Sequence, residues 1–317
     1  MIKIENLDNS EERPPLSSLL LLLGIILLSM VLGNFIGAAL MLYICKLGLN
    51  DFSNLNAAIM SSKNGWWAMM IAQGLASFLT FIAAGTFYWR VVEKKRMKDF
   101  NWRKFPPLKS LSIMLLIQIC FIPLSGWIQN INENMHLPAF LEPIERFMKN
   151  MEDNLAELTE FITTFNSNAQ LLTALMIIAV FAGIGEELVF RGIVQRKFYI
   201  AFKNPHLAIW FAAFIFSAIH LQFYGFFPRM LLGAMFGYFY FWTGNLWVPI
   251  LGHIFNNGLA LILIHLVHLK KVSPDLEKLD IVPMPVLIAS LTLFIYLIYY
   301  FIKSDYFENS SKEILQE

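Results

Sequence analysis

Two carboxylates and a guanidinium follow a stretch that otherwise has the composition of a membrane-spanning helix. The fifteen residues of Leu171–Gly185 are uncharged and mostly apolar, and Glu186, Glu187 and Arg191 come directly after them. A charge inside the hydrocarbon core costs at least about 2.5 kcal/mol, so ionisable residues there are candidates for function. Glu187 and Arg191 are four residues apart and can pair on one helix face. Glu186 is turned away from that face, so we expect this carboxylate to carry the chemistry.

Three polar residues further along the chain have the types and positions to join Glu186. His220 ends the apolar stretch FSAIH, and His253 and Asn257 share one helix face in HIFNN because they are four residues apart. At about 1.5 Å per residue, Glu186 and His220 lie at similar distances from the turn predicted between their helices. The following turn returns the chain so that His253 lies near the same level. The spacing therefore predicts that these side chains converge from three helices.

Such a set of side chains supports more than one kind of chemistry. Glutamate with histidine can activate water as a general base, and a histidine with an amide can donate hydrogen bonds to a developing oxyanion. Alternatively, Glu186, His220 and His253 could ligate a divalent metal such as zinc. The sequence has no HExxH, no GxSxG and no cysteine near the histidines, so serine and cysteine hydrolysis have little support. A proton relay in a transporter uses the same residue types.

The elements that must position these residues are membrane-spanning helices. Of the 317 residues, 57% are hydrophobic and 15% are charged, whereas soluble proteins have about 25% charged residues. A bilayer needs about 20 apolar residues per helix, and counting such runs predicts an all-α, polytopic membrane helix bundle of about eight transmembrane helices. The basic residues form no extended stripe, so nucleic acid is not an expected partner.

Loop charges predict how the bundle lies in the membrane. The loop Arg90–Lys109 holds eight basic and two acidic residues, whereas Glu133–Glu160 holds seven acidic and two basic residues. Because basic loops stay in the cytoplasm, the first loop is expected inside and the second outside, with both termini cytoplasmic. The chain shows no organelle-targeting signal, so a bacterial inner membrane is the expected location.

The acidic outer loop is predicted to contain an amphipathic helix. Its apolar residues recur at steps of three and four. They are Leu141, Ile144, Phe147, Met151, Leu155, Leu158 and Ile162. We expect this helix to lie on the outer leaflet or against the bundle, with a lid over the site as the alternative.

The three polar motifs together resemble those of the CPBP family of intramembrane proteases. This family includes the type II CAAX prenyl endopeptidases and the bacterial Abi proteins. EELVFR, FSAIH and HIFNN are similar to its motifs EExxxR, FxxxH and HxxxN and occur in the same order, within roughly Ala169–Leu269. The resemblance implies peptide-bond hydrolysis inside the membrane by an all-helical bundle. Together with the predicted spans, it divides the chain into three regions: 1–168 with three spans and the acidic loop, 169–270 with the expected catalytic core, and 271–317 with the last span and a tail.

The resemblance also assigns roles, residue by residue. It implies that Glu186 activates water with help from His220, and that His253 with Asn257 stabilises the oxyanion or helps to hold a metal. Supporting roles fall to Glu187, Arg191 and Phe216. Amides are poor zinc ligands, so the set favours the mechanism without metal.

The expected substrate is a membrane-associated or lipidated peptide or protein. Two other functions remain open: a non-enzymatic immunity or scaffold protein that keeps the fold, and a proton-coupled transporter that uses the same groups as a proton relay. Intact motifs argue against the first. A transporter would be expected to have further intramembrane carboxylates, and after Glu187 none occurs before Asp275.

Overall fold

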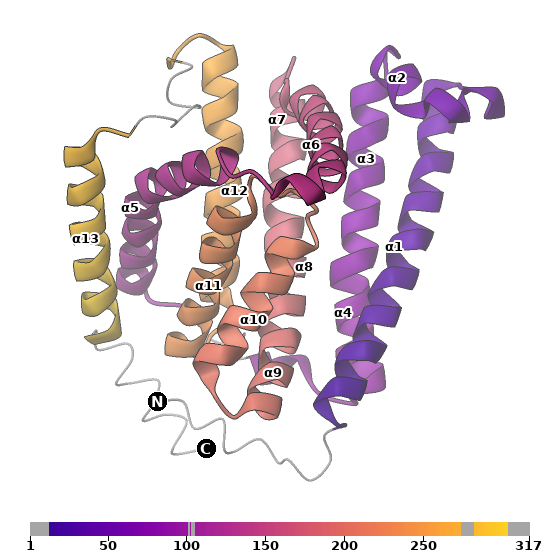
Figure 1. Cartoon of the computed structure of the whole chain (residues 1–317). Coiled ribbons are helices and arrows are strands. Elements are labelled where there is room, and N and C mark those ends of the chain that lie inside the picture. Colours follow the sequence, from indigo (N-terminus) through magenta and orange to yellow (C-terminus); the bar gives the residue numbers. More distant parts are fainter. Residues whose placement is uncertain (1–12, 101, 103–104, 274–281, 304–317) are drawn as a thin grey trace.

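The protein is an all-helical bundle whose longest helices are apolar enough to cross a membrane (Figure 1). A computed structural model describes residues 13–100, 102, 105–273 and 282–303, and this part contains helices and turns without a strand. Six helices of that part have the length and composition of membrane spans. They are α1 (Pro15–Cys45), the helix Gly65–Val92 with α3 (Gly65–Ser77) and α4 (Ala84–Phe87), α5 (Leu108–Glu133), the helix Asn168–Phe202 with α7 (Asn168–Ala174), α8 (Ala182–Glu187) and α9 (Gln195–Phe202), α12 (Trp247–His268) and α13 (Met284–Lys303). The predicted polytopic all-α fold is confirmed.

The expected count of eight spans differs from the structure because two helices are short or less apolar. These are α10 (Pro205–Ala218) and α11 (Phe226–Thr243), which pack side by side as a hairpin. With 14 residues, α10 is about 21 Å long, whereas the hydrocarbon core is about 30 Å thick. Figure 1 shows the turn of this hairpin partway up the bundle. Since the hairpin starts and ends at the same end of the bundle, it does not change the direction in which the helices after it cross the membrane.

The acidic loop forms the predicted amphipathic helix, α6 (Glu142–Thr163), which lies across one end of the bundle (Figure 1). We call this the acidic end. The other end, where the basic loop and α9 lie, is the basic end. A short helix, α2 (Leu55–Met60), is also at the acidic end.

Helix α5 is bent, and its second half runs across the front of the bundle (Figure 1). Pro123 lies inside it. A proline in a helix interior removes one backbone hydrogen bond and clashes with the preceding turn, which bends the helix. The bend carries the end of α5 over the turn of the α10–α11 hairpin.

Glycines allow the central helix Asn168–Phe202 to lie close against its neighbours. A Cβ atom on Gly183 would lie 2.7 Å from the Ile254 side chain of α12. On Gly185 it would lie 2.7 Å from Phe81, on the opposite neighbour. A larger residue at position 183 would push α8 away from α12, which carries the third polar motif, and one at position 185 would push it away from the helix Gly65–Val92.

A buried polar cluster ties three helices together at the basic end. The Glu93 carboxylate lies 3.1 Å from the Lys197 Nζ atom and accepts hydrogen bonds from Ser18 and Tyr88. Both side chains of the ion pair are almost fully buried. Burial alone would raise the pKa of the Glu93 carboxyl, but the hydrogen bonds from Tyr88 and Ser18 and the charge of Lys197 outweigh it and lower that pKa. This cluster links α1, α9 and the end of the helix Gly65–Val92.

Candidate active site

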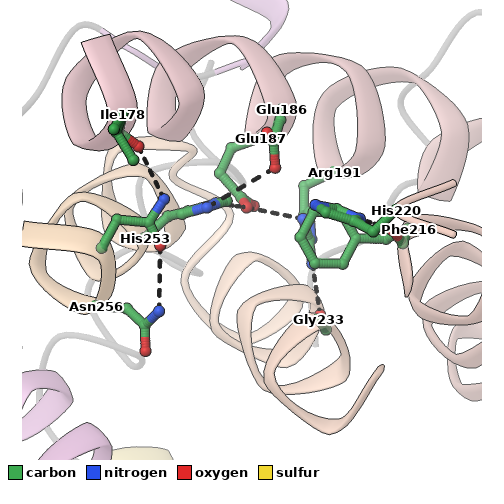
Figure 2. Close-up of polar contacts among 10 residues, drawn as sticks. Ile178, Glu186, Glu187, Arg191, Phe216, His220, Gly233, His253 and Asn256 are labelled. Atoms are coloured by element: carbon green, nitrogen blue, oxygen red, sulfur yellow. Dashed lines mark hydrogen bonds and ion pairs between the residues drawn. The ribbon is translucent and has the colours of Figure 1, made fainter. Parts of the chain in front are cut away.

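Glu187 is the centre of a buried network that joins two helices (Figure 2). Its side chain is fully buried, and its Oε1 atom accepts hydrogen bonds from Arg191 Nη1 at 2.7 Å and His253 Nδ1 at 2.8 Å. The predicted ion pair between Glu187 and Arg191 is therefore present. The contact with His253 was not predicted, and it gives Glu187 a second role, which is to orient the imidazole ring. A carboxylate that binds one ring nitrogen determines which nitrogen carries the proton.

Arg191 joins this network to α11. Its Nη2 atom donates a hydrogen bond to the Gly233 carbonyl at 2.8 Å. Its guanidinium lies 4.7 Å from the Phe216 ring centroid and 5.6 Å from that of Phe236, within the range of cation–π attraction. A buried charge is tolerated only when it is paired and hydrogen-bonded, and Arg191 meets both conditions. Phe216 of the second motif therefore contacts Arg191 of the first.

Glu186 faces His253 from the other side. The Glu186 Oε2 atom lies 3.8 Å from His253 Nε2, beyond hydrogen-bonding distance. Since Nδ1 donates to Glu187, the neutral ring has its lone pair on Nε2, toward Glu186. Glu186 makes no hydrogen bond within the described part of the chain, so its oxygens remain available to a water molecule or a substrate.

His220 lies at the turn of the α10–α11 hairpin. Its Nδ1 atom is 2.7 Å from the Phe216 carbonyl oxygen, which can only accept, so Nδ1 carries the proton. The Nε2 atom of the neutral ring is then free to accept a proton. The Phe216 ring packs edge-on against both His220 and His253.

One cavity of about 410 Å³ brings the predicted residues together. Its walls include Glu186, His220, His253 and Asn257. The convergence predicted from spacing is therefore found, on α8, the turn after α10, and α12. Asn257 donates from Nδ2 to the Ile178 carbonyl at 3.0 Å, which leaves the second hydrogen of its amide.

Several residues of the cavity were not predicted as site residues. Arg229 lines it, and its Nη2 atom donates to Gln222 Oε1 at 2.5 Å. The sequence contained a signal for Arg229, since it is the one Asp, Glu, Lys or Arg between Lys203 and Lys270. Gln222 had no such signal, because it lies in a turn whose position in the bundle no local pattern indicates.

The acidic helix α6 also reaches the cavity. Glu152 of α6 lines the cavity and accepts a hydrogen bond from the Tyr224 backbone nitrogen at 3.3 Å. Burial raises the pKa of the Glu152 carboxyl. The helix therefore lies against the bundle, and its Glu152 forms part of the cavity wall at the acidic end.

The central helix is locally π-helical before the two glutamates of the first motif and again directly after them. The π-helical turns are Leu175–Phe181 and Leu188–Val194, and they contain Ile178 and Arg191. Such turns are rare and often occur at functional sites. Both residues bind a group on another helix here, so the irregular turns coincide with the contacts that join the motifs.

The metal set considered from the sequence does not fit this geometry. In the part of the chain that the structure describes, no three His, Cys, Asp or Glu side chains are placed to hold one metal ion. Glu186, His220 and His253 line one cavity, and the Nδ1 atom of each ring binds a protein acceptor, a contact that metal-ligating histidines also make and that by itself excludes no metal.

A family model and a curated relative were compared with the chain, and the family match covers the region with the three polar motifs. Residues 168–259 match the model of the family "Type II CAAX prenyl endopeptidase Rce1-like". A stretch of 94 residues is 29% identical to "Uncharacterized protein YpbD" of Bacillus subtilis (strain 168); it covers 28% of this chain and 45% of that protein. No solved structure matches. The matched segment includes all three polar motifs, and residues 168–259 therefore form a domain of the Rce1-like family of type II CAAX prenyl endopeptidases.

Proposed function

We propose that the chain is an intramembrane endopeptidase that hydrolyses a peptide bond of a membrane-associated or lipidated peptide or protein. The observation that carries this proposal is that two adjacent glutamates have different surroundings. Glu187 is fully buried and holds Arg191 and His253, whereas Glu186 faces the cavity without a hydrogen bond in the described residues. Glu187 is therefore held in place by its partners, whereas Glu186 is free to take part in the reaction.

Glu186 and His220 are proposed to activate the water molecule. Glu186 takes a proton from water, and the Nε2 atom of His220 accepts a hydrogen bond from the same molecule. The hydroxide attacks the carbonyl carbon of the scissile bond, and the π electrons of the C=O bond move to its oxygen. The proton on Glu186 then goes to the leaving nitrogen as the C–N bond breaks. Water and peptide are consumed, and one carboxylic acid and one amine are formed.

His253 and Asn257 are proposed to stabilise the oxyanion. When both ring nitrogens of His253 carry hydrogen, Nδ1 donates to Glu187 and Nε2 is left to donate to the oxyanion. The second amide hydrogen of Asn257 is available for the same purpose. Loss of one such donor typically costs about 10²–10³ in kcat.

The proposed setting is a bacterial plasma membrane with both termini in the cytoplasm. The basic loop supports this orientation, because basic loops stay on the cytoplasmic side. In that orientation the helix α6 and the mouth of the cavity beneath it face outward. The lipid bilayer and a membrane peptide or lipidated protein are then the expected partners.

The experiment uses two internally quenched peptides and the purified chain in lipid vesicles. The first probe ends in a farnesylated CAAX sequence, and the second is an unlipidated hydrophobic peptide. Wild type is expected to cleave at least one of them, and Glu186→Gln and His220→Ala are expected to lower kcat by at least about a hundredfold. Cleavage that survives both substitutions would show that these residues are not catalytic. Folded protein that cleaves neither probe would point to a non-enzymatic role.

A further inference from the structure

A second cavity, of about 600 Å³, continues the catalytic cavity between α5 and α12. The two cavities share Ser125, Gln129, Leu232 and Asn256 in their walls. A volume of this size is typical of sites for organic ligands. We call the second cavity the α5–α12 groove.

The bend at Pro123 determines the position of this groove. Residues on one face of α5 line it at steps of three and four, from Gln118 on one side of the bend to Glu133 at the helix end. Asn256, Leu259 and Leu263 of α12 line the opposite wall. The bent half of α5 lies across the bundle, so the groove starts at the catalytic cavity and follows α12.

Gln118 is a buried amide in the wall of this groove that has nothing to bind. Its side chain is 4% exposed, and neither its nitrogen nor its oxygen has a hydrogen-bond partner in the described part of the protein. Leaving such a group unpaired costs about 1–3 kcal/mol. Gln118 also lies against Gly252, where a Cβ atom would be 3.1 Å from Nε2, and Gly252 directly precedes His253. The unpaired amide is therefore next to the helix segment that carries a proposed catalytic residue.

We propose that the α5–α12 groove binds an extended segment of the peptide substrate beside the scissile bond, and that the Gln118 amide pairs with a peptide group of that segment. An amide side chain offers a donor and an acceptor, which match the carbonyl and N–H of a backbone. Gln129 and Asn256 add polar groups where the groove joins the catalytic cavity. A purely hydrocarbon occupant would leave all three amides unused. This inference rests on the proposed endopeptidase function.

The first test removes the Gln118 amide but keeps its bulk. Gln118→Leu is expected to raise KM for the cleaved probe about tenfold, with kcat within a factor of about three. Its melting temperature should be unchanged or higher, because an unpaired buried amide is replaced by an apolar group. Gln195→Leu is the matched control, since Gln195 is another buried glutamine but lines neither cavity; its KM should equal that of wild type. A normal KM for Gln118→Leu would overturn the assignment of Gln118.

The second test locates the peptide without requiring turnover. A photoreactive phenylalanine derivative replaces Leu263, inside the groove, or its neighbour Ile262, which is 42% exposed on the outside of the bundle. Both variants carry Glu186→Gln so that the farnesylated probe is not consumed. Cross-linking is expected from position 263 and not from 262, with the modified atom on the peptide chain. Equal cross-linking from both positions, or cross-links only to the farnesyl group, would contradict a peptide groove.

The two tests separate failure of this inference from failure of the proposed function. If wild type cleaves a probe while Gln118→Leu has a normal KM and position 263 gives no cross-link, the groove assignment is wrong and the endopeptidase proposal stands. If wild type cleaves neither probe, the endopeptidase proposal fails. Cross-linking from position 263 would then show peptide binding, and its absence would reject the groove as well.

Discussion

Two buried glutamate–cation pairs in this bundle differ in what surrounds them. Glu93 faces Lys197 at the basic end, where hydrogen bonds from Ser18 and Tyr88 complete its shell. Glu187 faces Arg191 at the height of the cavity, and its other partner is His253, which itself borders the cavity. Both pairs hold helices together. Only the second pair also orients a side chain that lines the cavity. That side chain is His253, whose ring can exchange a proton with a substrate.

The largest effect is expected at the pair beside the cavity. Glu187→Gln keeps the side-chain shape but removes the charge that Arg191 and His253 both contact. Breaking a buried pair on one side costs about 3 kcal/mol, and a misplaced His253 should lower kcat by at least about a hundredfold. Thermal unfolding in detergent and kinetics on the cleaved probe measure the two effects. Normal turnover by the folded variant would show that Glu187 only supports the helices.

At the basic end the same substitution should affect stability alone. Glu93→Gln removes the negative charge that faces Lys197 and should lower the free energy of unfolding by about 3 kcal/mol. Per folded molecule, kcat and KM should remain within a factor of about two of wild type, because no residue of this cluster lines either cavity. A large loss of kcat in the folded variant would show that the two pairs are coupled through α9, and the contrast between them would fail.

A smaller effect is expected from pH on the basic-end pair. The pKa of Glu93 is lowered in the folded protein, so the unfolded chain binds more protons when the solution approaches the ordinary glutamate pKa of about 4.3. The stabilisation is thus complete above that pH and is lost as the pH falls through the lower folded value. The difference in melting temperature between wild type and Glu93→Gln should be constant from pH 7 to about 5 and shrink below about pH 4. A difference that grows on acidification would contradict the lowered pKa.

The smallest effect is expected from metal removal. No three ligand side chains in the described residues are grouped to hold a metal, so incubation with 1,10-phenanthroline should leave the cleavage rate within about twofold of the untreated enzyme. Elemental analysis of the purified protein is the accompanying measurement. Loss of activity on chelation with recovery on adding zinc would show that the side chains rearrange around a metal during catalysis.

What could be predicted from the sequence was mostly local in the chain. The pair Glu187–Arg191 follows from a four-residue step on one helix, and the shared face of His253 and Asn257 follows in the same way. The contact between Glu187 and His253 depends on how α12 is rotated against α8, which no local pattern specifies. Glu93 was counted among loop charges, because its burial depends on Lys197 being brought to it from a distant helix.

Hydropathy also could not predict how far each apolar helix extends across the membrane. An apolar run looks the same whether a helix crosses the bilayer or stops partway, so α10 and α11 were counted as full spans. The groove was missed for a related reason. Pro123 could be seen in the sequence, but which neighbour the bent half of α5 would cross depends on the packing of the whole bundle.

Because the α10–α11 hairpin starts and ends at the same end of the bundle, the length of its two arms sets the depth of its polar turn without reversing any other helix. When a helix crosses the whole membrane, a change in its length shifts the loop at its end relative to the membrane surface. In the α10–α11 hairpin, matched insertions in both arms would shift His220 along the bundle axis by about 1.5 Å per residue while every other helix keeps its orientation. Each inserted residue also turns the helix by about 100°, so insertions of whole turns would be needed to keep His220 facing the cavity.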